Sequence, residues 1–158
     1  TLKINKKEVK KALMSALSAT ADKKQISLRY ERIEEKDLKE REFPIIVESG
    51  LISLKTKDLL GSVKKILGEK IFIVSLRKKD VRSGKGKHRG RKYKSNAGIL
   101  IVTGKNEKMK AKAFHTKNTE NLGISDLAGG GPGRLVIYTE NAIRELGEKF
   151  TNSGEKIK

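Results

Sequence analysis

The first apolar pattern along the chain has the period of an amphipathic helix. Asn5 and Glu8 have the spacing of a capping box, in which each side chain bonds a backbone amide at the start of a helix. The residues that form one apolar face follow at intervals of three and four, and they are Val9, Leu13, Ala16 and Leu17. The spacing predicts a helix that ends near Thr20.

Three further segments are predicted to be helical. Thr56 can cap a helix whose apolar face ends at Leu67, and Gly68 is placed to end it. Thr139 can cap a last helix, and residues 108–114 favour a short helix. The apolar faces of the two capped helices contain Leu59, Leu60, Val63, Ile66 and Leu67 in the first, and Ala142, Ile143 and Leu146 in the second.

Short continuous apolar runs predict strands between these helices. The runs are residues 45–47, which follow Pro44, and residues 71–76, 98–103 and 135–138. Such runs are typical of strands that are covered on both faces. Strands that alternate with helices predict an α/β fold with a mainly parallel sheet, helices packed on it, and a long basic loop, residues 77–97, between two strands.

The remaining segments have weaker patterns. Residues 25–30 alternate briefly between polar and apolar, and residues 31–42 have mixed charge, which indicates an exposed connection. Residues 151–158 lack periodicity and are predicted to be a disordered tail. We therefore expect a single α/β domain over residues 1–150, a length that can bury one hydrophobic core.

Composition adds a strong positive charge to this picture. The chain of 158 residues has 37 Lys and Arg against 19 Asp and Glu, a formal net charge of +18 that favours a polyanionic partner. It has no Cys, so disulfides and thiolate metal sites are excluded, and we expect no structural zinc and no cofactor. No apolar run is long enough to span a membrane, which favours a soluble intracellular protein.

Half of this charge lies in residues 77–94, RKKDVRSGKGKHRGRKYK, which carry a net +9. Lys and Arg neutralise phosphates, glycines let the backbone approach a sugar-phosphate chain, and Arg or Tyr can stack on an unpaired base. Loops of more than about 12–15 residues in a compact domain are usually functional or disordered. The residues that we predict to contact RNA here are Arg77, Lys78, Lys79, Arg82, Ser83, Gly84, Lys85, Gly86, Lys87, His88, Arg89, Gly90, Arg91, Lys92, Tyr93 and Lys94.

Charge alone leaves other readings of this segment open. A solvated flexible loop, a nuclear localisation signal and a DNA-compacting protein have similar basic clusters. Aromatic residues are 4% of the chain, and no recognition-module, helix-turn-helix or zinc-finger spacing is present. The sequence thus favours recognition of a folded RNA by its shape and phosphates over reading of a single strand.

A second glycine-rich element, residues 128–135, directly precedes a predicted strand. A phosphate-binding loop of nucleotide hydrolases instead follows a strand and ends in Gly-Lys-Ser or Gly-Lys-Thr. A nucleotide-dependent enzyme that uses residues 129–133 is therefore the weaker alternative. Arg134 has two interpretations: it reaches an RNA phosphate, or it forms an internal salt bridge beside a structural turn.

The sequence offers little support for catalysis, and we expect a protein that is not an enzyme. His88 lies among cations without a carboxylate to orient it, and His115 has no evident partner. Glu34, Glu35 and Asp37 lie in the mixed-charge segment, where a solvated face is the better explanation.

Three collinear motifs resemble the family of protein four of the large ribosomal subunit, in its archaeal and eukaryotic form. Residues 81–94, VRSGKGKHRGRKYK, resemble its basic loop, and residues 12–21, ALMSALSATA, resemble its Ala-Ser-rich helix. Residues 126–135, DLAGGGPGRL, and 138–142, YTENA, resemble its closing glycine loop, strand and helix, although the family loop more often reads Ala-Pro-Gly-Gly.

The resemblance implies an α/β core in the cytoplasmic ribosome. The implied partners are large-subunit ribosomal RNA and neighbouring large-subunit proteins, with a role in subunit assembly and with no membrane and no small-molecule substrate. Family members normally begin with a further N-terminal region whose arm helps to line the exit tunnel. Thr1 stands where a translated chain carries Met, and we expect this region to be absent from the sequence.

Overall fold

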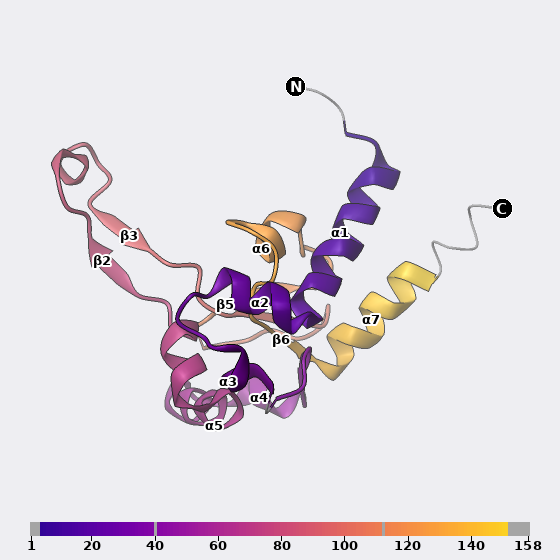
Figure 1. Ribbon diagram of the computed structural model, residues 1–158. Helices are drawn as coiled ribbons and strands as arrows, with labels where there is room; N and C mark the ends of the chain where they lie inside the picture. Colours follow the sequence, from indigo (N-terminus) through magenta and orange to yellow (C-terminus); the bar gives the residue numbers. More distant parts are fainter. Residues whose placement is uncertain (1–3, 40, 112, 152–158) are drawn as a thin grey trace.

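The computed structural model describes residues 4–39, 41–111 and 113–151, and its centre is a four-stranded parallel sheet (Figure 1). The strand order is β1-β6-β4-β5, with β1 at Ile45–Val47, β4 at Leu100–Thr103, β5 at His115–Asn118 and β6 at Val136–Thr139. In register, Ile101 of β4 lies opposite Ile137 of β6 and Thr116 of β5. A separate antiparallel hairpin, β2 at Lys79–Val81 and β3 at Tyr93–Ser95, projects from the body.

Helices cover both faces of the sheet and make a three-layered α/β/α fold. The helices are α1 (Lys6–Ala21), α2 (Lys23–Arg29), α3 (Glu35–Lys39), α4 (Gly50–Ser53), α5 (Thr56–Ser75), α6 (Ile124–Ala128) and α7 (Glu140–Thr151). On one face, Ile101 and Ile137 pack in a core that includes Leu59, Val63 and Leu67 of α5. On the other, the core is made by alternate residues of β4 and β6 and by α1, α6 and α7.

This architecture confirms the predicted α/β class and the mainly parallel sheet. Asn5 caps α1 by accepting a hydrogen bond from the Lys7 amide at 3.0 Å, and the Ala142 amide donates to Thr139 at the start of α7. Strands β1, β4 and β6 form where continuous apolar runs predicted them, and the side chains of β4 and β6 are buried on both sides of the sheet. Strand β1 lies at an edge, so Ile46 stays half exposed.

The predicted strand over residues 71–76 is wrong, because this run continues α5 as helix. Gly68 breaks the helix, at φ 72°, without ending it. A Cβ at Gly68 would lie 2.5 Å from the Arg41 guanidinium, which donates to the Ile66 carbonyl at 3.2 Å. After this break Ile71 and Ser75 are buried at helical spacing. An apolar run of six residues is compatible with either structure, and burial on one side here selects the helix.

Other predictions on the weaker patterns also need correction. Residues 108–111, 113 and 114 are not helical, and the polar segment after them forms β5. The brief alternation of residues 25–30 belongs to α2, and part of the mixed-charge connection forms α3, whose Leu38 is fully buried. Thr151 is the last residue of α7, and the rest of the predicted tail, 152–158, lies outside the described residues.

The carboxyl ends of the parallel strands are joined by the carboxylate of Glu107. It accepts hydrogen bonds from Ser49 after β1 (2.6 Å), Thr139 at the end of β6 (2.7 Å), the Gly104 amide after β4 (2.7 Å) and Asn141 in α7 (2.8 Å). Burial by itself raises the pKa of Glu107, but these hydrogen bonds together hold it below the ordinary value.

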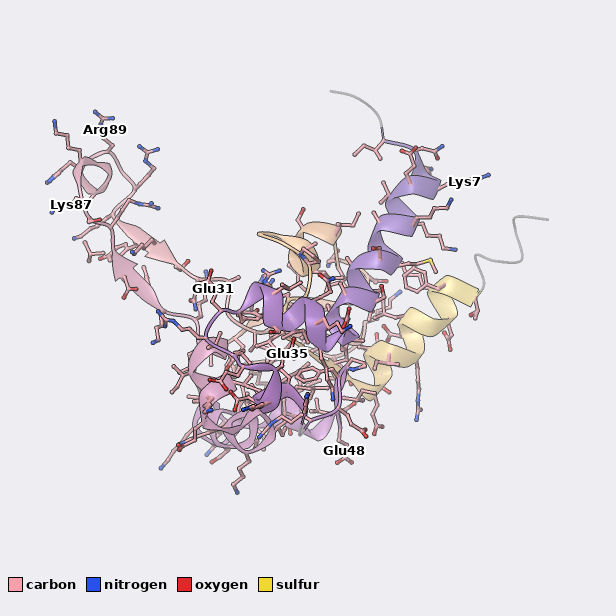
Figure 2. The ribbon with its side chains drawn as sticks, in the orientation of Figure 1. Lys7, Glu31, Glu35, Glu48, Lys87 and Arg89 are labelled. Atoms are coloured by element: carbon pink, nitrogen blue, oxygen red, sulfur yellow. The ribbon has the colours of Figure 1, made fainter. Side chains whose placement is uncertain are left out.

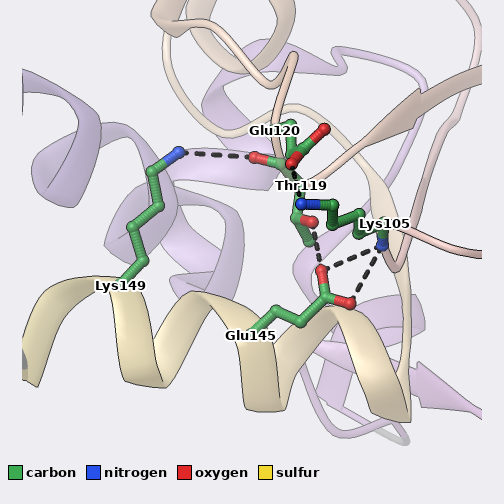
Figure 3. Close-up of polar contacts among 5 residues, drawn as sticks. All are labelled: Lys105, Thr119, Glu120, Glu145 and Lys149. Carbon is green, nitrogen blue, oxygen red and sulfur yellow. Dashed lines mark hydrogen bonds and ion pairs between the residues drawn. The ribbon is translucent and has the colours of Figure 1, made fainter.

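A second carboxylate, Glu145, attaches α7 to the same end of the sheet (Figure 3). It accepts from the Lys105 amide at 2.9 and 3.0 Å and from the hydroxyl of Thr119. Lys149 donates to the Thr119 carbonyl at 3.4 Å, and Lys105 pairs with Glu120 at 2.8 Å. The turns after β4 and β5 are thus both held by side chains of α7.

Removing the Glu107 carboxylate is expected to destabilise the fold and weaken its acid sensitivity. Glu107→Ala leaves several part-buried donors without an acceptor, which we expect to cost about 2–4 kcal/mol of unfolding free energy at pH 7. Because the folded pKa of Glu107 is depressed, its stabilisation is present above the unfolded pKa of about 4.3 and is lost as the pH falls through the folded pKa.

Urea unfolding at pH 7 and at pH 3.5 measures both effects. Glu107→Gln should lose less stability than the wild type between these two pH values. The exposed Glu148→Gln on α7 is the control, and it should behave like the wild type. An equal loss of unfolding free energy between the two pH values in wild type and Glu107→Gln would contradict the depressed pKa of Glu107.

Candidate nucleic-acid interface

The basic segment forms a hairpin that has no hydrophobic core of its own. Lys79, Asp80 and Val81 pair with Ser95, Lys94 and Tyr93, and every side chain of the two strands is exposed. The Arg82 amide extends the ladder by donating to the Lys92 carbonyl at 2.8 Å. An isolated two-stranded hairpin is marginally stable in water, so the shape of this one depends on its turn and on its attachment to the body.

The turn at the tip is a 3₁₀ helix, η1 (Lys85–His88), enclosed by glycines. Gly84 and Gly90 adopt φ 76° and 74°, a region that other residues rarely enter. The Arg91 amide donates to the Gly86 carbonyl at 3.2 Å, and the Arg82 side chain donates to the Arg91 carbonyl at 3.2 Å. The glycines predicted to allow close approach of a phosphate chain therefore also have a structural role, which is to close the turn.

Positive charge is concentrated on this hairpin and separated from several acidic side chains. Figure 2 shows Lys87 and Arg89 extending from the tip, whereas Glu31, Glu35 and Glu48 lie on the body. Lys7 marks a second basic surface on α1, which extends from the body at a different place. Tyr93 is 49% exposed, and Lys79 lies 4.2 Å from its ring centroid.

The two ends of the hairpin are fixed to each other and to the sheet at a neck, residues 75–78 and 96–99. The Asn96 side chain accepts from the Lys78 amide at 2.7 Å and donates to the Leu76 carbonyl at 2.9 Å. The Ile99 amide donates to the Ser75 carbonyl at 2.9 Å. Gly98, at φ 62°, is required here because a Cβ would lie 2.9 Å from the same carbonyl.

Arg134 lies beneath the neck and is only 4% exposed. Its guanidinium donates to the carbonyls of Ala97 at 2.9 Å, Gly98 at 3.2 Å and Asp126 at 2.5 Å. It also lies 3.3 Å from Nδ1 of His115; burial, followed by the charge of Arg134, lowers the pKa of His115 and favours the neutral ring that can accept this bond. The structure favours the internal interpretation of Arg134, with carbonyls in place of the expected carboxylate.

The glycine-rich loop, residues 129–133, packs against α2. Arg29 donates to the carbonyls of Gly129, at 2.8 Å, and Gly131. Gly130, Gly131 and Gly133 have positive φ, and a Cβ on Gly133 would lie 2.4 Å from the Gln25 carbonyl. These contacts confirm that the glycines supply left-handed or tightly packed backbone.

The structure therefore places the predicted residues in two groups. The residues from Arg77 to Lys94 lie together on the neck and hairpin, where their side chains are exposed. Arg134 lies apart from them in the interior, and residues 77–94 connect a helix and a strand, where the sequence predicted two strands. Sequence reasoning missed Asn96, Ser75 and Arg29, because nothing in their local sequence signals contacts 18 to 102 residues away.

No metal or membrane feature accompanies this surface. Within residues 4–39, 41–111 and 113–151, no cluster of three or more His, Cys, Asp or Glu side chains is arranged to hold a metal ion. No helix in those ranges is long and apolar enough to cross a membrane.

An α/β fold that carries an exposed basic hairpin has the electrostatic footprint of the class of nucleic-acid-binding proteins. Comparison with known families makes this class specific. The model of the ribosomal protein L4/L1 family matches residues 1–149, and the chain belongs to this family. The resemblance found in the sequence is thereby confirmed.

Archaeal relatives agree with this assignment. The chain is 38% identical over 157 residues to the large ribosomal subunit protein uL4 of Methanocaldococcus jannaschii, an overlap of 94% of this chain and 60% of that protein. It is 38% identical over 153 residues to uL4 of Thermoplasma acidophilum, an overlap of 93% and 58%. The chain thus spans somewhat more than half of the length of these relatives.

The contacts of Arg134 predict a stability defect when it is replaced. Arg134→Met removes the donors for three carbonyls, which we expect to cost about 3 kcal/mol, and Arg134→Lys cannot replace the planar fork and should also destabilise. Urea unfolding measures the cost, with the exposed Arg144→Lys as control. Native stability in both Arg134 variants, together with weaker RNA binding in Arg134→Met alone, would instead identify a phosphate contact.

Proposed function

We propose that this chain is a structural constituent of the large ribosomal subunit, which binds large-subunit ribosomal RNA through the hairpin and supports assembly of the subunit. The observation that carries the proposal is a net charge of +9 on residues 77–94, held on an exposed hairpin in a chain of the L4/L1 family. Cationic side chains on such a surface bind phosphates and release the counterions condensed on RNA.

The shape of the hairpin supports recognition of a folded RNA. Two short strands and a 3₁₀ turn carry basic groups on an extended projection, which can enter an RNA groove or a junction where phosphates approach from several sides. Tyr93 and the arginines near the tip add flat surfaces for stacking. Basic residues from Arg77 to Lys94, with the glycines between them, are the proposed contacts.

Family membership also supports the wider role. The relatives are named as large ribosomal subunit proteins, and we propose that this chain shares their assembly: the ribosome in the cytoplasm, with neighbouring large-subunit proteins as further partners. The proposed role is architectural and uses no catalytic group, cofactor or small-molecule substrate.

Removing four tip charges tests the proposal. In the variant Lys85→Ala, Lys87→Ala, Arg89→Ala, Arg91→Ala, the slope of log Kd against log salt for large-subunit ribosomal RNA should fall by about 1 per lost contact, about 3–4 in total. Filter binding at several salt concentrations measures it. Duplex DNA of similar length should bind more weakly than the RNA at physiological salt, which distinguishes this function from DNA compaction.

A matched control removes the same charge from the body. Lys36, Lys39, Lys57 and Lys65 are exposed, and their replacement by Ala lowers the net charge equally. This control should keep most of the wild-type slope. The proposal fails if the tip variant keeps its slope, or if both quadruple variants lose the same amount.

A further inference from the structure

A hollow of about 390 Å³ lies beside the neck of the hairpin, and the rRNA-binding function proposed above does not use it. Its walls come from the end of α2 and the loop after it, the last turn of α5, both chains of the neck and Gly130 of the glycine-rich loop. This volume is within the range of about 300–1,000 Å³ that is typical of sites for small organic groups. Four segments far apart in sequence thus make one concave surface next to the basic hairpin.

Part of the lining of the hollow is apolar and reached by solvent, and we call its residues Tyr30, Ile73 and Val74 the floor. Ile73 is 53% exposed, and Val74 and Tyr30 line the same surface. Tyr30 is fixed in place, because its hydroxyl accepts from the Leu135 amide at 3.2 Å and the Arg29 guanidinium lies 5.8 Å from its ring centroid. Fixed aromatic and aliphatic side chains are suited to bind a flat apolar face, such as that of a nucleobase.

The charged part of the lining, which we call the rim, is mainly positive. It consists of Arg29, Arg32 and Lys78, against one carboxylate among the lining side chains, Glu31. Arg32 and Lys78 are exposed, whereas Arg29 is held by the glycine-rich loop. Lys78 also belongs to the neck of the hairpin, so it links the rim to the basic hairpin. A phosphate chain that follows the hairpin therefore meets cationic side chains all the way to the hollow.

A second hollow beside the neck lacks the apolar surface on which a base can lie. It shares Asn96 and Ala97 with the first, but polar and charged side chains make up most of its lining, and Arg134 and Asp126 are among them. A polar surface of this kind can meet a sugar or a phosphate, but it lacks a floor for stacking. The first hollow alone of these two combines an apolar floor with a cationic rim.

We propose that the hollow at Tyr30, Ile73 and Lys78 receives one unpaired nucleotide of the bound ribosomal RNA. The base lies on the floor of Tyr30, Ile73 and Val74, and the adjacent phosphates lie against Arg32 and Lys78. Glu31 on the rim accepts a hydrogen bond from an amino group of the base. This inference rests on the RNA-binding function, and it adds a subsite for a single-stranded position to a hairpin that binds phosphates.

Two variants test the contact with the base and the contact with the phosphate separately. Ile73→Ser should weaken binding of large-subunit ribosomal RNA by roughly 3- to 30-fold, the effect of a lost apolar contact with the base, and should leave the salt slope unchanged. Arg32→Ala should lower that slope by about 0.7, the value for one phosphate of a single strand. Both side chains are exposed, and thermal unfolding followed by circular dichroism checks that each variant folds.

The chain offers a matched control for each variant. Ile46 is 52% exposed on β1, outside the lining of the hollow, so Ile46→Ser removes a similar apolar surface elsewhere. Arg144→Ala removes one exposed arginine from α7. Both controls should bind RNA as the wild type does. RNA substituted with 4-thiouridine should crosslink to the peptides that contain Tyr30 or Ile73, and the joined nucleotides should be unpaired.

Several results would overturn the subsite. One is equal RNA affinity for Ile73→Ser and Ile46→Ser, in an experiment where the tip variant has lost its slope and the hairpin function therefore stands. Another is crosslinking of these peptides to base-paired nucleotides. A third is calorimetric binding of free nucleoside monophosphates that Ile73→Ser abolishes while RNA affinity stays unchanged, since the hollow would then serve a free nucleotide.

Discussion

The position of the hairpin is set at its neck, where the Ile99 amide donates a hydrogen bond to the Ser75 carbonyl at 2.9 Å. This bond joins the start of β4 to the end of α5, and it is possible because Gly98 has no side chain in the space between them. Arg134 holds the same corner from beneath through the carbonyls of Ala97 and Gly98. The side chains of the two hairpin strands are exposed, so the contacts at the neck set the orientation of the hairpin relative to the sheet.

The neck also connects two motifs that are distant in sequence, the basic hairpin and the glycine-rich loop. The glycine-rich loop positions Arg134 at the start of β6, and Arg134 supports the hairpin. Arg29 in turn holds the loop and lies at the hollow beside the neck. A high local charge repels itself, and a projecting hairpin lowers that repulsion because water screens its exposed groups while the core stays apolar.

The strongly periodic or strongly apolar parts of this fold could be predicted from the sequence. Helices α1 and α7 and strands β1, β4 and β6 have patterns that packing on a two-sided sheet reinforces. Strand β5 could not be predicted, because an edge strand of polar, half-buried residues has no hydrophobic signature. The hairpin could be located because charge is a property of sequence, whereas the buried role of Arg134 and the hollow at Ile73 depend on tertiary contacts.

The two ends of the parallel sheet have different physical character, and this difference bears on function. Open α/β sheets usually bind ligands at the carboxyl ends of their strands. Here Glu107 and Glu145 occupy that end, accept the available amide and hydroxyl hydrogens, and would repel a phosphate placed there. The neck, the glycine-rich loop and the cationic hollow all lie at the amino ends of β4 and β6. Glu107 and Glu145 thus close the usual ligand end of this sheet with internal hydrogen bonds, and the basic hairpin and its neck lie at the opposite, amino end.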